Sequence, residues 1–186
     1  MPLRLLALFL ACAALAGRSF AADHPLALDP AASHIEVAVR ATGDSFTARL
    51  SSFAATIATD DAGRVNAAQV TFHFRDLATG KPKRDDAMHA WQDTKQFPDG
   101  RFELLALEEQ PAAGAPRARG RLTLHGVTRE LQFPVSVMHE GNLYSIDGDV
   151  ALDTREFGLP IIRLMLVLKV DPVVHVRFHL QGRRQP

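Results

Sequence analysis

The chain has 186 residues, 47% of which are apolar, and its 21 basic side chains are balanced by 21 acidic ones. This apolar fraction excludes a disordered chain. The balanced charge argues against a nucleic-acid-binding protein, which needs an excess of Lys and Arg to neutralise phosphates. The aromatic residues comprise eleven Phe but only one Trp and one Tyr, which indicates an apolar interior in a protein of one domain.

The N-terminal segment has the pattern of an export signal. Arg4 precedes an uncharged apolar run over residues 5–16. A membrane span needs about 20 apolar residues, so this run is too short for one, but it fits the hydrophobic region of a secretory signal. We therefore expect residues 1–21 to be a signal peptide and the protein to have no stable membrane span.

Small residues mark the end of this signal. Ser19 and Ala21 occupy the two positions that signal peptidase reads, so we predict cleavage after Ala21. A cut after Ala16 is the second choice, and a lipoprotein cut before Cys12 fits the neighbouring residues poorly. Residues 22–186 would then form one domain exported to the periplasm. It would contain no cysteine, so its stability must come from a packed core instead of disulfides.

Apolar and polar residues alternate along most of the chain from residue 34 onward, as in strands that bury one face. Val70, Phe72 and Phe74, for example, alternate with polar neighbours. The predicted strands, about eight in number, cover residues 34–40, 46–57, 70–75, 117–124, 130–137, 144–152, 161–170 and 173–181. Segments 110–116 and 153–160 are rich in Pro, Gly or Ala and are expected to be loops.

One segment, Asp85 to Lys95, has a helical pattern instead. Asp85 or Asp86 can cap its start, and Met88 and Trp91 lie on one face. Strands with one apolar face and so few helices favour either a closed barrel or a sandwich. The long strands and the many large apolar residues favour the barrel, which at eight strands can hold one small ligand.

Several segments, in order along the chain, resemble conserved motifs of the YceI-like family. They are Leu28-Asp29-Pro30 with residues 33–37, Thr79-Gly80 with Arg84-Asp85, Phe97-Pro98 with Phe102-Glu103, the hairpin sequence over residues 120–128, and Asp153 to Gly158. The hairpin is the most specific match. The chain departs from the family after its first strand, where Arg40 to Ser45 stand in place of the His-x-Gly-x-Ser stretch of many members.

This resemblance implies an all-β fold, an extended antiparallel lipocalin-like β-barrel with one short helix near the mouth. It also implies a periplasmic binding or carrier protein that sequesters a long-chain apolar lipid in the barrel. The lipid would be of the polyisoprenoid, isoprenoid quinone or fatty amide type. On this interpretation the protein is not an enzyme, has no cofactor besides the lipid, and binds no nucleic acid.

Large apolar side chains on the inward faces are expected to line the cavity. The predicted lining residues are Phe46, Phe72, Phe74, Met88, Trp91, Phe97, Phe102, Leu122, Leu131, Phe133, Leu164, Leu166 and Phe178. Three of them, Met88, Trp91 and Phe97, could form a lid over the mouth. The alternatives are an ordinary helix on the barrel edge, and side chains that fill the barrel to leave a structural or partner-binding module.

An enzyme or metal-handling protein is a further alternative. Asp85 and His89 are four residues apart on the predicted helix and could form an acid–base dyad at the mouth. No nucleophile or phosphate-loop motif accompanies them. His175 and His179 share a strand face about 13 Å apart, too far to bind one ion, and His73 could meet either only across strands. We expect solvated outer-face histidines and no metal site.

The strand predicted over residues 161–170 is apolar on both faces. Met165 and Val167 alternate with Leu164, Leu166 and Leu168. Such a strand needs cover on both sides, either from the helix or from another subunit. A weak homodimer through this outer strip is therefore an additional hypothesis.

Overall fold

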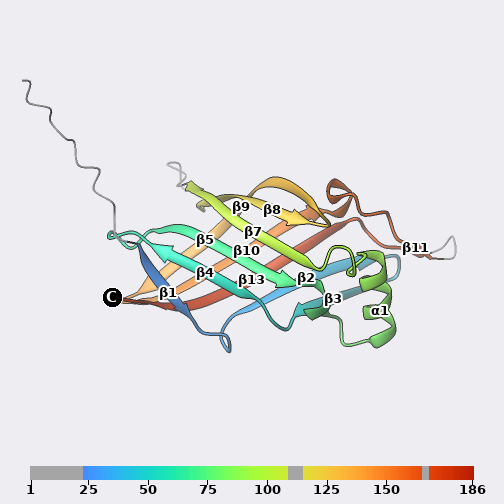
Figure 1. Ribbon diagram of the computed structural model, residues 1–186, viewed down its shortest axis with the longest axis horizontal. Helices are drawn as coiled ribbons and strands as arrows, with labels where there is room; N and C mark the ends of the chain where they lie inside the picture. Colours follow the sequence, from blue (N-terminus) through green and yellow to red (C-terminus); the bar gives the residue numbers. More distant parts are fainter. Residues whose placement is uncertain (1–22, 109–114, 165–167) are drawn as a thin grey trace, which may run out of the picture.

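The computed structural model describes residues 23–108, 115–164 and 168–186, which form strands and one short α-helix (Figure 1). The elements are β1 (His24–Leu28), β2 (His34–Ala41), β3 (Asp44–Leu50), β4 (Ala54–Thr59), β5 (Val65–His73), η1 (Phe74–Asp76), β6 (Leu77–Ala78), α1 (Pro82–Trp91), β7 (Asp99–Glu108), β8 (Arg117–Leu124), β9 (Val127–Glu140), β10 (Leu143–Asp153), η2 (Thr154–Phe157), β11 (Arg163–Leu164), β12 (Leu168–Lys169) and β13 (Val173–Arg184). The predicted signal peptide and the strip around Met165 and Val167 lie outside the described residues.

Eight of the strands close into an antiparallel barrel, the architecture that the sequence predicts, although β1 and β7 of this ring are not among the predicted strands. Their order around the ring is β1, β4, β5, β7, β8, β9, β10 and β13, and β13 pairs with β1 to complete it. The β10–β13 ladder runs from Leu143 opposite Arg183 to Asp153 opposite Val173. These two long strands give the barrel its length in Figure 1.

Strand β13 has different partners at its two ends. Residues 182–184 pair with β1, whereas residues 175–179 pair with β2. Beyond β2 the sheet continues through β3 to β6. Helix α1 lies beside this extension in Figure 1, and its Met88 packs against Leu50 and Leu77. The extension and the helix therefore build one end of the barrel.

The opposite end is closed by a compact core. Leu26, Ile57 and Tyr144 are buried together there, and Tyr144 is only 1% exposed. The Tyr144 hydroxyl donates a hydrogen bond of 3.0 Å to the carbonyl oxygen of Gly63. A buried phenol needs such a partner, because an unpaired hydroxyl would oppose burial. Among the described residues, this end of the barrel is therefore well packed.

The helix differs from its predicted limits. It begins at Pro82 with Lys81 as N-cap, rather than at Asp85 or Asp86, and it ends at Trp91 instead of Lys95. Proline at the first helical position lacks only an N–H that would have had no partner in the helix, so it is a favourable start.

The single long strand predicted over residues 161–170 is wrong. The chain there forms the two-residue strands β11 and β12, which pair with each other. The segment turns back on itself, and the N–H of Val170 donates to the carbonyl of Ile162 at 3.1 Å. A segment apolar on both faces carries no period-two signal, so its pattern could not reveal this turn. The predicted loop after Asp153 begins with the short helix η2.

Candidate functional site

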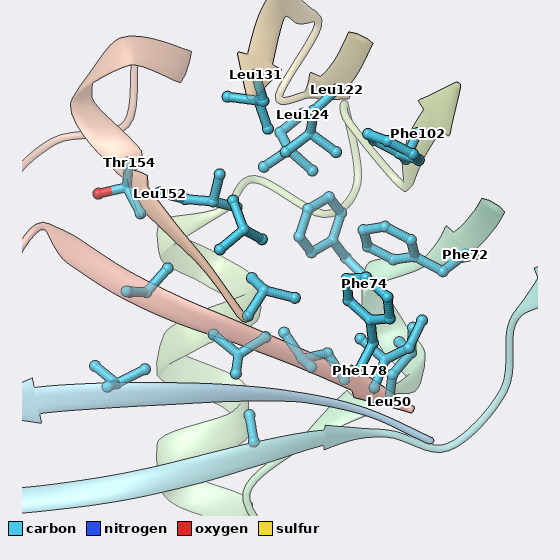
Figure 2. Close-up of a pocket in the computed structure, with 18 of the residues that line it drawn as sticks. Leu50, Phe72, Phe74, Phe102, Leu122, Leu124, Leu131, Leu152, Thr154 and Phe178 are labelled. Atoms are coloured by element: carbon cyan, nitrogen blue, oxygen red, sulfur yellow. The ribbon is translucent and has the colours of Figure 1, made fainter. Parts of the chain in front are cut away.

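The barrel encloses a cavity of about 850 Å³. Its wall comes from β2 to β5, β7 to β10, β13 and α1. Along β10, Ile146 and Val150 face this cavity while Asp147 and Asp149 lie between them on the outer face, as period-two alternation requires. Figure 2 shows the side chains around this space, which are almost entirely hydrocarbon. The interior is hollow, so the alternative of a completely filled barrel does not describe this structure.

Most of the predicted lining residues lie on the cavity wall. They are Phe46, Phe72, Phe74, Met88, Trp91, Phe102, Leu122, Leu131, Phe133 and Phe178. Helix α1 contributes two of these, Met88 and Trp91, and so forms part of the wall. The side chain of Leu164 and all of Leu166 lie outside what the structure describes. The wall position is a geometric finding, and contact of these residues with a ligand stays a prediction.

Phe97 lies elsewhere. Its ring contacts that of His125 at 4.2 Å between centroids, in the turn between β8 and β9. Gly126 of the same turn has a positive φ of 73°, and a Cβ there would lie 2.9 Å from the Phe97 ring. The ring thus packs against this turn and is not one of the residues that line the cavity. A sequence pattern that marks Phe97 as apolar cannot distinguish these two packing sites.

Among the described residues, polar side chains occur at only one end of the wall. They come from α1, from the start of β3, and from the segments that flank η2 and β13: Asp44, Lys83, Arg84, Gln92, Thr154 and Asp171. Asp44 and Lys83 are exposed to solvent, whereas Ile57 and Val65 at the other end of the cavity are buried. The mouth therefore lies beside α1, and a molecule inside would meet polar groups only there.

Arg84 is held in place at the mouth by two contacts. Its Nη2 donates to Asp44 Oδ2 at 3.1 Å, and its guanidinium lies 4.0 Å from the centroid of the Phe46 ring. An ion pair and a cation–π contact together favour one position of this long side chain. Arg155, by contrast, bonds Asp153 and is not on the wall.

Trp91 connects the helix to the segment that follows η2. Its Nε1 donates a hydrogen bond of 2.7 Å to the carbonyl oxygen of Pro160, and both residues line the cavity. Helix α1 therefore spans one side of the mouth and is fastened on the other side through Trp91. This geometry is consistent with the predicted role of Met88 and Trp91 as a lid.

Gln92 is a wall residue that the sequence did not identify. It is the C-cap that follows α1, is 2% exposed, and its Nε2 has no hydrogen-bond partner among the described residues. The sequence could not identify it as a wall residue, because a polar residue directly after Trp91 is also typical of an exposed helix end. Burial of such an amide without a partner costs free energy, so Gln92 is the least satisfied polar group of this wall.

Asp85 and His89 do not bond each other among the contacts of the described residues. Asp85 Oδ1 accepts from the N–H and the hydroxyl of Thr79, at 2.7 and 2.6 Å. The Thr79 hydroxyl is the largest cause that holds the pKa of Asp85 below its ordinary value, and His89 adds a smaller effect. His89 Nε2 lies 3.1 Å from the carbonyl oxygen of Leu77. Both side chains thus fasten α1 to the preceding turn.

The three strand histidines considered as metal ligands are paired with carboxylates instead and do not line the cavity. His73 bonds Asp99 across β5 and β7, while His175 and His179 bond Asp149 and Asp147 across β13 and β10. Within the described part of the chain, no cluster of three or more Cys, His, Asp or Glu could hold a metal ion. In the same residues, no helix has the length and hydropathy to cross a membrane.

Comparison with known proteins gives a family and a set of similar folds. A model of the YceI-like domain matches residues 26–182. BcnA of Burkholderia cenocepacia has a similar structure, with a TM-score of 0.73 and 23% identity over 83% of this chain and 99% of that one. A polyisoprenoid-binding domain from Saccharophagus degradans, implicated in plant cell wall breakdown, is also similar in structure. Its TM-score is 0.64, and its sequence is 17% identical over 87% of this chain and 98% of that one.

A YceI protein of Campylobacter jejuni also has a TM-score of 0.64, at 14% identity over 75% of this chain and 85% of that one. At these identities the structural matches establish the barrel fold alone. A search of curated proteins found no match.

Proposed function

We propose that this chain, which belongs to the YceI-like family, sequesters a long-chain apolar lipid in its barrel and carries it through the periplasm without chemical change. The observation that carries this proposal is the cavity of about 850 Å³ whose polar wall residues occur only at the mouth. Such a cavity suits a molecule with a long hydrocarbon part and a polar end at the α1 side.

Desolvation of the lipid tail supplies the binding free energy. Burial of apolar surface contributes about 25 cal/mol per Å², so a chain that buries about 400 Å² gains roughly 10 kcal/mol before entropic costs. No specific hydrogen bond is needed for this term. The protein can therefore hold its ligand without a charged binding motif, which agrees with the scarcity of polar groups on the wall.

The lipid classes we propose are polyisoprenoids, isoprenoid quinones and fatty amides. The similar domain from Saccharophagus degradans is described as polyisoprenoid-binding, which supports the first class. At the mouth, the charges of Lys83 and Arg84 are offset by Asp44 and Asp171. This balance favours an end group without a high net charge.

Export completes the proposal. The apolar run that follows Arg4 and the small residues Ser19 and Ala21 support cleavage of residues 1–21 and a periplasmic location for residues 22–186. A water-soluble carrier in that compartment would shield a lipid that water does not dissolve.

The test is a substitution that fills the cavity. Val150 faces the cavity on β10, whereas its neighbour Ala151 is exposed on the outer face. We expect wild-type protein and Ala151→Trp to retain a lipid in native mass spectrometry, and to bind an added isoprenoid quinone after delipidation. Val150→Trp should do neither, because the indole occupies the space of the chain.

Melting curves show whether each variant is folded, and Leu124→Trp on β8 gives a second filled cavity. Equal lipid binding by folded Val150→Trp and Ala151→Trp would contradict the proposed function, as would wild-type protein that binds no lipid before or after delipidation.

A further inference from the structure

Three glycines lie on the inward face of the barrel, each beside a phenylalanine of a neighbouring strand. Gly100 on β7 is paired with Phe72 on β5, and Gly148 on β10 is paired with Phe178 on β13. In register pairs of this kind both side chains point to the same face of the sheet. Phe72 and Phe178 both line the cavity, so the missing side chains of these glycines would point into it as well.

The third glycine also faces inward, but the phenylalanine beside it is its diagonal neighbour and not its partner in register. Gly120 on β8 lies between Ala118 and Leu122, which line the cavity, and it is therefore an inward position. Its partner on the neighbouring strand β7 is Leu104. Phe102 lies two residues before Leu104 on β7, and its ring extends over Gly120.

Each ring occupies the space where a β-carbon would stand. A Cβ on Gly100 would lie 2.2 Å from Cζ of Phe72. The corresponding distances are 2.4 Å for Gly120 with Phe102 and 2.4 Å for Gly148 with Phe178. Carbon atoms make contact at about 3.5–4.0 Å, so none of these rings could keep its position over an alanine.

The rings therefore rest against the barrel wall because glycine is there. A phenylalanine ring that could not lie over its neighbour would have to adopt another rotamer about its Cα–Cβ bond, and the remaining free space is the cavity. Glycine in a strand is itself unfavourable, because it loses more backbone freedom on folding and offers no side chain to pack. Its presence at three inward positions needs a compensating benefit.

We infer that Gly100, Gly120 and Gly148 determine the width of the cavity and thereby select the thickness of the bound chain. This inference rests on the proposed function and specifies its ligand. A wide bore is superfluous for an unbranched alkyl chain but necessary for a chain that carries methyl branches. The glycines thus favour methyl-branched hydrocarbon chains over linear ones.

The aromatic contacts on the wall transmit the effect from one glycine to the next. Phe102 and Phe178 both contact Phe133, with ring centroids 5.8 and 6.1 Å apart. These rings form one row over β7 to β13, with Gly120 under Phe102 and Gly148 under Phe178. A ring displaced at one glycine would therefore also disturb its neighbours in the row.

The experiment compares two alcohols of equal main-chain length, phytanol, which has methyl branches, and hexadecanol, which has none. Binding to delipidated protein is followed through Trp91, the one tryptophan of the chain, which lines the cavity. For Gly148→Ala we expect roughly a tenfold loss of affinity for phytanol and a much smaller loss for hexadecanol, because overpacking penalises the thicker chain more.

Two further variants distinguish an effect on the width of the cavity from a general effect on folding. Gly148→Ala combined with Phe178→Leu should recover phytanol binding, because the smaller side chain makes room for the new methyl group. Ala151→Val, which adds methyl groups to the exposed face of the same strand, should bind both alcohols as wild type does. Melting curves confirm that each variant is folded.

The inference is overturned if folded Gly148→Ala binds phytanol as wild type does. It is also overturned if both alcohols lose affinity equally and Phe178→Leu does not restore them. Wild-type protein that binds neither alcohol nor any other lipid would contradict the proposed function instead. In that case the crystal structure of Gly148→Ala decides the inference, since an unchanged cavity volume would refute it.

Discussion

Asp149 shows how single residues hold the outer face of the barrel together. Its Oδ1 bonds His175 Nδ1 at 2.9 Å, and its Oδ2 accepts from Arg177 Nε at 3.0 Å. Both partners lie on β13, so one carboxylate on β10 binds two positions of the neighbouring strand. The His175 hydrogen bond is the largest cause that holds the pKa of Asp149 below its ordinary value of 3.8, and Arg177 contributes as well.

This shift predicts an acid-dependent contribution to stability. Because the pKa is lower in the folded protein, the contribution is complete above about pH 4 and is lost as the pH falls through the folded value. Asp149→Asn should lower the melting temperature at neutral pH by a few degrees at most, since the carboxylate is 47% exposed and exposed pairs are worth about 0–1 kcal/mol.

Melting curves of wild type and Asp149→Asn across the acid range provide the measurement. The difference between the two proteins should shrink once the pH is well below 3.8. A difference that stays constant down to the lowest pH at which the protein folds would show that the carboxylate charge is not the cause.

At the scale of elements, the sequence predicted the strands that have one apolar and one polar face. It did not predict the short strands or the limits of segments that are apolar on both faces. The alternation around Val70 and Phe72 fixed an inward face that the structure confirms. The segment over residues 161–170 has no such contrast between faces, and its Val170 forms a bridge with Ala41, which is far away in the sequence. The start of α1 was misplaced because Asp85 has the character of a cap but serves the turn at Thr79 instead.

That contact predicts a specific role for α1. Asp85 joins the helix to Thr79, so its loss should loosen the helix that forms one side of the mouth. Asp85→Ala should release a bound lipid several-fold faster and lower the melting temperature, because two hydrogen bonds to a charged group are lost. Asp86→Ala, an exposed position of the same helix, is the matched control.

Stopped-flow transfer of a fluorescent isoprenoid to lipid vesicles measures the release rate. If release from Asp85→Ala is as slow as from Asp86→Ala, α1 does not control exit from the cavity. If Asp85→Ala retains the lipid normally but loses a measurable catalytic activity, the alternative of an Asp85–His89 dyad would be favoured over the carrier.

For the whole molecule, the residue pattern predicted a barrel but not how it closes, and only the family resemblance favoured a hollow interior over a filled one. Closure depends on β13, which pairs with β1 at one end and with β2 at the other, and no local pattern encodes such a shared strand. A filled barrel and a hollow one have the same alternation of residues. The hollow depends on where the rings rest, and therefore on glycines such as Gly148 that a pattern analysis treats as interruptions of a strand.

The proposed carrier role requires export, which the predicted signal peptide over residues 1–21 would direct. Ser19 and Ala21 precede the predicted cut, so the exported protein should begin at Ala22 and keep 165 of the 186 residues. It should contain no thiol, because Cys12 would leave with the signal. N-terminal sequencing and the intact mass of protein from a periplasmic extract measure both.

Ala21→Lys should leave the uncleaved precursor in the membrane fraction, because signal peptidase requires a small residue before the cut. A mature chain that begins at Gly17 would replace the predicted site by the one after Ala16. A chain that begins at a lipid-modified Cys12 would make the protein a membrane-anchored lipoprotein, and a full-length chain confined to the cytoplasm would contradict the periplasmic carrier.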